Sequence, residues 1–334
     1  MTGPARPERR DRSDGSERLD QSDELDLPAG SDRPEPPERS HDAERRDPGE
    51  RLDPAGRPDP PERRPLPTDA STLPPLGPAF DDELSRGLAT LGVSLSRGSR
   101  AAIDAHARLL MAWNEAINLT ALRTPEQVAR LHVLDSLTAL RLLADERVRL
   151  RGRAPTLLDL GSGGGYPGLP LAVALPVARA ALVDSVGKKA RFLAAVAAAA
   201  WAAMRAEEED PPVLESLPER AEDLAQEPDH RDAWDVVTAR AVGSLAEVAE
   251  LSFPLLRPGG RLVCWKTRGA PGSLEAELAE ARGTVLAVGG DRPRIHAVAL
   301  PGLPGHVLVE IPKVRETPWR FPRSPAERRR ALLR

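Results

Sequence analysis

The sequence predicts an α/β fold with a mostly parallel, doubly wound sheet, an N-terminal helical cap and a C-terminal antiparallel hairpin. From residue 156 onward, short apolar runs alternate with helical stretches. Strands that are nearly all apolar and are each followed by a helix are typical of a parallel sheet covered on both faces. Before residue 153 the spacing of apolar residues is helical, and the last two apolar runs have no helix between them.

The first 78 residues differ from the rest of the chain in composition. They contain 16 of the 35 prolines and no Val, Ile, Phe, Trp or Tyr, and their 13 arginines stand against 19 acidic residues. Such a segment cannot bury enough apolar surface to offset the entropy lost on ordering it. We therefore expect residues 1–78 to form a disordered, acidic, Pro- and Arg-rich extension. The remaining 256 residues carry a net charge of +2.

The cap is predicted at residues 79–152 and contains three expected helices, at 79–95, 99–118 and 124–143. In the first, Leu84, Leu88 and Leu91 follow a helical period. In the third, Thr124 is suited to the N-cap and Pro125 to the first helical position.

The second domain is predicted at residues 153–315. Its parallel strands are expected at 156–160, 181–184, 213–217, 234–239 and 261–266, with helices at 167–175, 188–206, 244–256 and 273–282. The runs at 284–288 and 306–312 are expected to pair as the terminal hairpin. Residues 316–334, which end in an arginine-rich stretch, are predicted to be a basic tail.

The composition excludes several classes of protein. A single cysteine, Cys264, rules out an intramolecular disulfide and a cysteine-rich metal site, so no metal is predicted. No apolar run approaches 18 residues, and the first residues lack the apolar core of a signal peptide. We expect a cytoplasmic protein without a membrane partner.

The motif with the most chemical content is LLDLGSGGGYPG at residues 157–168. In an open α/β sheet, the turn after the first strand usually holds the cofactor. A dinucleotide turn reads G-x-G-x-x-G, but its third position here is Tyr166. The spacing Asp159-x-Gly161-x-Gly163-x-Gly165 instead resembles the D/E-x-G-x-G-x-G turn of S-adenosylmethionine-dependent methyltransferases, the Rossmann-like class I fold. Bare glycine backbone would let the methionine tail of that cofactor lie close to the turn, although a purely structural turn is the alternative.

Two further elements agree with this cofactor. Asp184 ends the second predicted strand, 23 residues beyond Gly161, where a carboxylate can accept hydrogen bonds from both ribose hydroxyls. Ala221 and Glu222 follow the third strand, where these enzymes place a residue beside the adenine ring. The alternative for Asp184 taken alone is a solvated strand end.

The motifs that the sequence lacks narrow the range of chemical groups that could accept the methyl group. Methylation of exocyclic amines commonly uses an Asn/Asp-Pro-Pro-aromatic turn after the fourth strand, but the sequence here is TARAVGS, with Arg240. Attack at pyrimidine C5 needs a cysteine, and Cys264 lies in mid-strand, where a buried and inert thiol is expected. Guanine N7 fits best because its lone pair needs no deprotonation, so catalysis would rest on positioning and electrostatics.

The chain resembles the bacterial 16S ribosomal RNA guanine-N7 methyltransferases, also called the glucose-inhibited division protein B family. The resemblance covers residues 79–313 and rests on stretches that occur in family order: WNEAINLTALRTPEQ (113–127), HVLDSL (132–137), LDLGSGGGYPGLPLA (158–172), LVDSVGKKARFL (182–193), ERAEDL (219–224), TARAVGSL (238–245) and GGRLVCWK (259–266). It implies methyl transfer from S-adenosylmethionine to N7 of a guanine in 16S ribosomal RNA, with that RNA or the small ribosomal subunit as partner.

The resemblance also implies residue roles. The cofactor contacts would be Gly161, Tyr166, Ala221, Glu222 and Arg240. The residues facing the nucleotide or the RNA backbone would be Asn118, Thr120, His132, Asp135, Ser136, Lys188, Arg191 and Lys266. No general base is expected, and Arg240 and His132 are the candidates for catalytic positioning. Each has a structural alternative: a satisfied core histidine, residues that end a helix, or cations on a solvated helix.

The sequence departs from the family pattern at two places. An arginine usually precedes the cap histidine, but Leu131 stands there and Arg130 lies one position earlier. An Arg-His pair is expected before the last strand, where this chain has Gly305-His306. Two other functions remain open at this stage: a small-molecule or protein methyltransferase on the same fold, and a non-catalytic ribosome-binding factor.

Overall fold

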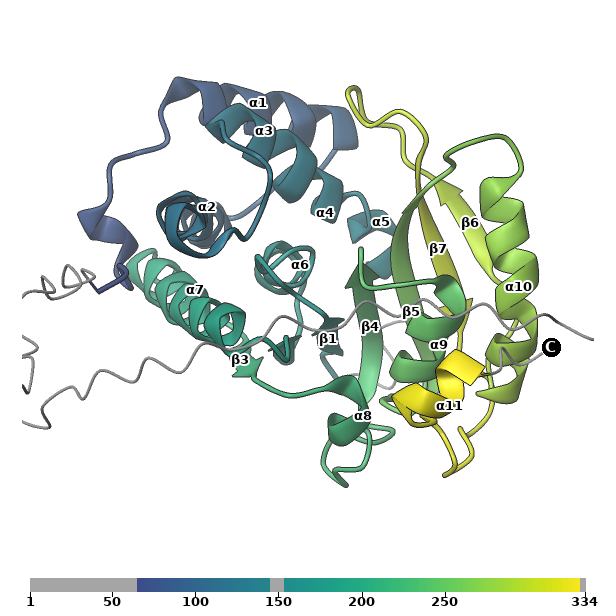
Figure 1. Cartoon of the computed structure of the whole chain (residues 1–334). Coiled ribbons are helices and arrows are strands. Elements are labelled where there is room, and N and C mark those ends of the chain that lie inside the picture. Colours follow the sequence, from purple (N-terminus) through teal and green to yellow (C-terminus); the bar gives the residue numbers. More distant parts are fainter. Residues whose placement is uncertain (1–64, 145–152, 331–334) are drawn as a thin grey trace, which may run out of the picture. The chain divides into compact units, whose positions relative to one another are not determined.

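The computed structural model describes residues 65–144 and 153–330. Its sheet has seven strands in the order β3-β2-β1-β4-β5-β7-β6 (Figure 1). The strands are β1 (Thr156–Leu160), β2 (Arg179–Val183), β3 (Val213–Leu217), β4 (Trp234–Arg240), β5 (Leu256–Thr267), β6 (Arg294–Ala297) and β7 (His306–Pro312). The first five strands pair in parallel, and β5, β7 and β6 pair antiparallel. The predicted fold class, a parallel sheet with a C-terminal antiparallel hairpin, is confirmed.

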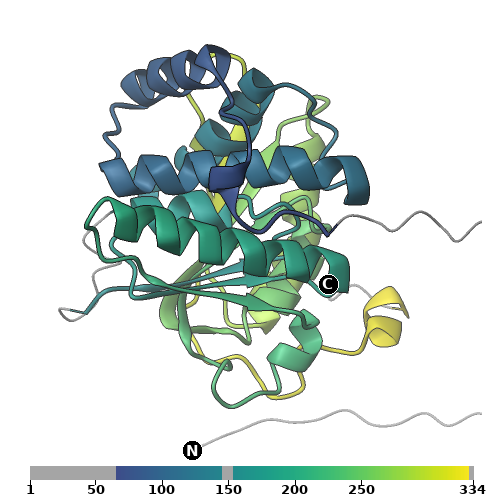
Figure 2. The ribbon, with the colours of Figure 1, turned by 90° about the vertical axis from the view of Figure 1, so that its left-hand side faces the viewer.

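Helices cover both faces of the sheet. They are α1 (Pro78–Leu91), α2 (Arg97–Ile117), α3 (Pro125–Val128), α4 (Asp135–Leu137), α5 (Leu140–Leu143), α6 (Gly168–Ala174), α7 (Gly187–Ala206), α8 (Ala221–Leu224), α9 (Leu245–Ser252), α10 (Ser273–Ala287) and α11 (Pro325–Arg330). Alternate strand residues serve different cores: Leu157 packs with the cap, α6 and α7, whereas Leu158 packs with α9 and α10. The cap helix α2 lies along α7, which is itself packed on the sheet (Figure 2).

The ordered cap begins earlier than the sequence predicted. Residues 65–78 contain the short 3₁₀ helix η1 (Ala70–Thr72). The indole Nε1 of Trp113 donates to the carbonyl oxygen of Pro67 at 2.6 Å, and Leu66, Leu73 and Leu76 pack against the core. The prediction of disorder is wrong for residues 65–78, because these few apolar side chains find a partner on α2. Residues 1–64 lie outside the described residues.

The third cap helix is divided. Thr124 caps α3 as predicted, accepting a hydrogen bond from the backbone N–H of Gln127 at 3.3 Å. A π-helical turn, η2 (Ala129–Leu134), then separates α3 from α4. The hydroxyl of Ser136 donates to the carbonyl oxygen of His132 at 2.6 Å, just beyond this turn. Residues 145–152, the end of the predicted cap, lie outside the described part of the chain.

One predicted strand is wrong. Residues 284–288 were expected to form the first strand of the hairpin, but α10 extends to Ala287. Ala281, Thr284, Val285 and Val288 are buried together, which is the i, i+3, i+4, i+7 spacing of a helix. The strand that pairs with β7 is β6, a mostly exposed edge strand in which Ile295 is the only large apolar residue. None of the helices in the described residues is long and apolar enough to cross a membrane.

Candidate active site

The turn after β1 has the backbone conformation that its glycines predict. Gly161, Gly163 and Gly165 have φ angles of 65°, 56° and 84°, in the left-handed region that side chains disfavour. A Cβ atom on Gly161 would lie 2.8 Å from Cγ2 of Val242, and one on Gly165 would lie 2.7 Å from Nε2 of His106. The turn therefore needs glycine for its conformation and for the close approach of its neighbours.

Asp184 joins the end of β2 to this turn. Its Oδ2 accepts a hydrogen bond from the N–H of Gly163 at 3.0 Å, and its Oδ1 accepts one from the N–H of Val186 at 2.9 Å. The Nζ of Lys189 lies 3.7 Å from the same carboxylate. Because each carboxylate oxygen has two lone pairs, both keep the capacity to accept one more hydrogen bond. The carboxylate is thus fixed in orientation without being saturated.

A cavity of about 380 Å³ opens beside these residues, at the carboxyl ends of β1 and β2. It is lined by Leu160, Gly161, Val183, Asp184, Ser185, Glu219, Arg220, Ala221, Glu222, Val242, Glu247, Leu251, Pro325, Arg328 and Arg329. Four of the nine predicted cofactor residues therefore meet at one cavity: Gly161, Asp184, Ala221 and Glu222. Its lining includes four carboxylates and three guanidinium groups.

Asp159 does not line this cavity, contrary to the prediction. It is fully buried: its Oδ2 accepts from Ser162 Oγ at 2.5 Å and from the N–H of Gly168 at 3.1 Å, and its Oδ1 accepts from Thr238 Oγ1 at 2.7 Å. Burial raises the pKa of Asp159 to about 6, although these hydrogen bonds act in the opposite direction. Asp159 connects the turn to α6 and β4, so its contribution is structural.

Tyr166 is also buried away from the cavity. Its ring lies between two histidines, with ring centroids 4.2 Å from His106 and 4.6 Å from His132. The guanidinium of Arg240 lies 5.7 Å from the ring centroid. The Tyr166 hydroxyl has no hydrogen-bond partner among the described residues. The stack turns the ring of Tyr166 into the cap, so its side chain does not line the cavity, and the predicted cofactor contact of this residue stays a prediction.

Arg240 binds the cap instead of the cavity. Its Nη1 donates to Oδ2 of Asp135 at 3.0 Å and to the carbonyl oxygen of Leu131 at 3.2 Å. Its Nη2 lies 3.1 Å from Nδ1 of His132. Asp135 is itself buried and also lies 3.0 Å from Nδ1 of His306 through Oδ1. The predicted residues Arg240, His132 and Asp135 are thus brought together, but as a network between β4 and the cap.

This network fixes the protonation of His132. Burial and the nearby charge of Arg240 lower the pKa of His132 to about 3, so the ring is neutral at pH 7. Because a guanidinium only donates, Nδ1 must accept and Nε2 must carry the hydrogen. Nε2 lies 2.8 Å from Oγ1 of Thr120 and therefore donates to it. The Thr120 oxygen also accepts from the N–H of Leu122 at 3.1 Å.

The other predicted RNA residues fall into two groups. Asn118, Lys188 and Arg191 are exposed, Asn118 at the end of α2 and the two cations at the start of α7. Ser136 is fully buried and donates to the cap backbone, and Lys266 donates to Oε1 of Glu277 at 2.6 Å. An RNA contact does not fit the last two, because one is inaccessible and the charge of the other is already paired.

Comparisons with known proteins assign the chain to a family. A family model described as rRNA small subunit methyltransferase G matches residues 99–296. The ribosomal RNA small subunit methyltransferase G of Roseiflexus castenholzii is 36% identical over 250 residues, covering 74% of this chain and 98% of the relative. That of Sorangium cellulosum is 38% identical over 265 residues (78% and 98%), and that of Bacillus subtilis is 32% identical over 248 residues (73% and 95%).

The chain belongs to this family. It is therefore a methyltransferase that uses S-adenosylmethionine, and the cavity can be tested against that cofactor. Gly161 lines the cavity with bare backbone, and a Cβ at this position would lie too close to Val242. The oriented carboxylate of Asp184 suits a ribose diol, and the excess of carboxylates in the lining suits a sulfonium cation. The residues fit the cofactor.

Sequence reasoning missed several residues of the methyltransferase. His106 has an ordinary helical position in α2, and nothing in its neighbours along the chain indicates that it stacks on Tyr166. Trp265 donates from Nε1 to the carbonyl oxygen of Asp135 at 2.9 Å. Arg328 and Arg329 come from the tail, where the cluster of arginines was the only available signal.

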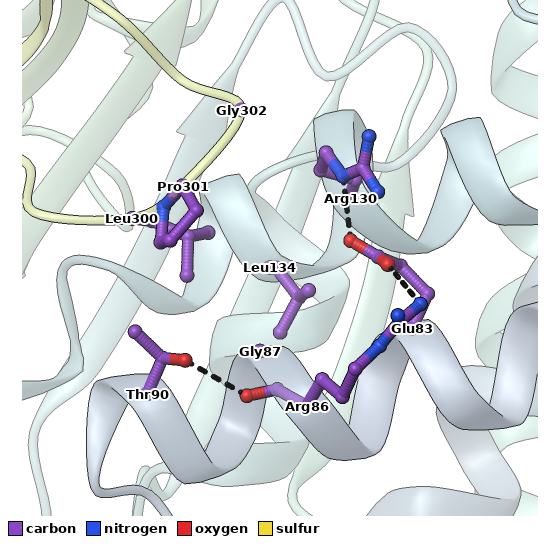
Figure 3. Close-up of a pocket in the computed structure, with 9 residues that line it drawn as sticks. All are labelled: Glu83, Arg86, Gly87, Thr90, Arg130, Leu134, Leu300, Pro301 and Gly302. Carbon is purple, nitrogen blue, oxygen red and sulfur yellow. Dashed lines mark hydrogen bonds and ion pairs between the residues drawn. The ribbon is translucent and has the colours of Figure 1, made fainter.

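A second cavity, of about 410 Å³, lies in the cap between α1, η2 and residues 300–302 (Figure 3). Glu83 is one of its lining residues and pairs with Arg86 at 2.8 Å and with Arg130 at 2.5 Å. Arg130, the nearest substitute for the arginine that the family pattern expects before His132, is therefore held by acidic side chains. No residue of the glycine turn lines this second cavity, so it is separate from the cofactor site.

Proposed function

We propose that this methyltransferase transfers a methyl group from S-adenosylmethionine to N7 of a guanine in 16S ribosomal RNA. The observation that carries the proposal is the left-handed glycine turn beside the oriented Asp184 carboxylate, in a chain of the small-subunit methyltransferase G family. Gly161, Asp184, Ala221 and Glu222 are the proposed cofactor residues. An rRNA substrate also implies that the enzyme works in the cytoplasm, where ribosomes are assembled.

The chemistry of the acceptor agrees with this assignment. When bound, the cofactor supplies an electrophilic methyl group on sulfur. Guanine N7 has a free lone pair and carries no proton, so this chain needs to orient the base and does not need to remove a proton. Cys264 is fully buried, and burial raises the pKa of its thiol to about 12, which argues against a cysteine nucleophile. Arg240 and His132 are the proposed positioning residues for the guanine, because their hydrogen bonds link β4 to Thr120.

Thr120 is the proposed hydrogen-bond donor to the base. Its oxygen accepts from His132 and from Leu122, so its hydroxyl hydrogen is left to donate outward. In guanine, the O6 acceptor is adjacent to N7. We expect Thr120→Val to raise KM for the RNA without changing the Kd of the cofactor. An unchanged KM would contradict this role.

Lys188 and Arg191, exposed at the start of α7, are the proposed contacts to the RNA phosphates. RNA binding through these contacts should weaken as the salt concentration rises.

The function is tested by comparing 16S RNA from a deletion strain and its parent by mass spectrometry. Loss of one N7-methylguanine, restored by the wild-type gene, supports the proposal. Persistence of every such base refutes it. Labelled cofactor incubated with small subunits and, separately, with cell metabolites and proteins distinguishes an RNA enzyme from a small-molecule or protein methyltransferase. Calorimetry with S-adenosylmethionine tests the non-catalytic alternative, for which no binding is expected.

A further inference from the structure

The C-terminal segment (residues 317–330) lies beyond the part of the chain that the family model matches. It is nevertheless firmly attached to the methyltransferase domain. Phe321 is fully buried, and the guanidinium of Arg231 donates to the carbonyl oxygens of Thr317 and Phe321, each at 3.2 Å. Arg323 forms a hydrogen bond from Nη2 to Oε2 of the buried Glu250 at 2.6 Å. The segment is therefore anchored immediately before α11.

From this anchor, α11 reaches the cofactor cavity. Pro325, Arg328 and Arg329 form part of the lining, together with residues that follow β2 and β3. The Nη2 of Arg328 donates to Oε1 of Glu222, and its Nη1 donates to the carbonyl oxygen of Arg323 at 2.6 Å. The side chains of Arg328 and Glu222 are only 11% and 18% exposed. The guanidinium thus bridges the tail anchor and a proposed cofactor residue.

The ion pair favours the charged form of Glu222. Partial burial, the largest single influence, would raise the pKa of this carboxyl, but the hydrogen bond from Arg328, a backbone hydrogen bond and the charges of Arg328 and Arg220 together lower it. Without Arg328, the carboxylate would lose the cation that holds its orientation. Arg330, on the same helix, is exposed and takes no part in the lining.

We infer that the C-terminal segment is a wall of the S-adenosylmethionine site and that Arg328 is a positioning residue, which holds Glu222 for the adenosine half of the cofactor. This inference rests on the proposed function. The cavity keeps its volume of about 380 Å³ with the segment in place, within the range of about 300–1,000 Å³ of small-molecule sites. We therefore expect the cofactor to bind without displacing the arginine. An RNA-binding role does not suit Arg328, because its guanidinium is directed inward at a carboxylate.

The experiment measures the Kd of S-adenosylhomocysteine by calorimetry for the full-length wild type, Arg328→Ala, Arg328→Lys and the control Arg330→Ala. We expect Arg328→Ala to raise the Kd roughly tenfold, as for the loss of one charge-assisted hydrogen bond. Arg328→Lys should restore part of the affinity, and Arg330→Ala should bind like the wild type. In a Glu222→Gln background, Arg328→Ala should have little further effect, because the arginine acts through that carboxylate. A purely structural role would weaken binding equally in both backgrounds.

The possible failures are distinguishable. A wild type that binds no S-adenosylhomocysteine refutes the proposed function and this inference with it. Normal wild-type binding with an unchanged Kd for Arg328→Ala refutes only the inference, and an effect on RNA binding alone would assign the arginine to the RNA. Tighter binding by Arg328→Ala would mean that the segment competes with the cofactor, which also overturns the inference. If Arg328→Ala does not fold, Arg328→Lys and Glu222→Gln provide the same comparison from the two sides of the ion pair.

Discussion

His106 should make the stability of the protein depend on pH in the mildly acidic range. The ring is 0% exposed, its Nε2 lies 2.7 Å from the carbonyl oxygen of Gly164, and its Nδ1 has no partner among the described residues. Protonation would bury a cation whose second N–H lacks an acceptor. Burial accordingly lowers the pKa of His106 from 6.5 to about 4, against the opposing effect of the Gly164 hydrogen bond.

The sign and size of the effect follow from these two pKa values. The unfolded chain binds the proton of His106 more tightly than the folded chain does. The contribution of His106 to the free energy of unfolding therefore has its full value above pH 6.5, where His106 is neutral in both states. It is lost as the pH falls toward 4. Between pH 7 and pH 5, the pair of values gives a loss of about 2 kcal/mol in the free energy of unfolding.

The assay is urea unfolding at pH 7, 6 and 5, followed by tryptophan fluorescence, for the wild type and for His106→Gln. Glutamine does not titrate, so the drop in unfolding free energy between pH 7 and pH 5 should be smaller in the variant by about 2 kcal/mol. The matched control is Tyr166→Phe, which keeps the aromatic stack and should leave the drop as it is in the wild type. An equal drop in His106→Gln and the wild type would refute the reasoning.

Three further substitutions test the site. Gly161→Ala puts a Cβ at positive φ and against Val242, so we expect the free energy of unfolding to fall by roughly 1–2 kcal/mol and calorimetry to show weakened cofactor binding. Wild-type affinity in this variant would contradict the role of the bare Gly161 backbone in binding the cofactor. Asp184→Ala should weaken cofactor binding by about 1–3 kcal/mol, because polar groups of the ligand lose their partner, and an unchanged Kd would argue against the ribose role. Asp135→Ala leaves the guanidinium of Arg240 without its carboxylate and should lower the urea-unfolding free energy by roughly 3–5 kcal/mol; a loss below about 1 kcal/mol would show that the pair is not structural.

Most of the sheet could be predicted because a buried strand can be recognised in the sequence as an apolar run with polar ends. The buried strands at 156–160 and 306–312 have the predicted bounds. The partly exposed edge strand at 213–217 also has the predicted bounds, because Val213, Leu214 and Leu217 give it an apolar run. The other edge strand, β6, could not be found in this way, because it is mostly exposed and has only one large apolar residue. Residues 284–288 misled the prediction for the opposite reason: Val285 and Val288 are apolar, but they are buried at helical spacing.

The parts of the candidate site that directly follow a strand could be predicted, because the spacing of residues along the sequence decides their place in the sheet. Gly161 and Asp184 follow adjacent parallel strands, so the topology brings them to one edge of the sheet. The direction of a side chain within a strand is a separate question. Asp159 shares a face of β1 with Leu157, which packs beneath α6, and this alternation turns its carboxylate away from the cavity. The stack on Tyr166 and the path of the C-terminal segment depend on tertiary contacts that no local pattern encodes.

Asp135 has a consequence for how the molecule can move. From one buried position in the cap it contacts Arg240 on β4, Trp265 on β5 and His306 on β7. A hinge that opened the cap would have to break all three contacts at once. The N-terminal helices are therefore no independent lid over the catalytic half. We expect both halves to melt together, and an incoming nucleotide to meet a surface whose shape is set before it arrives.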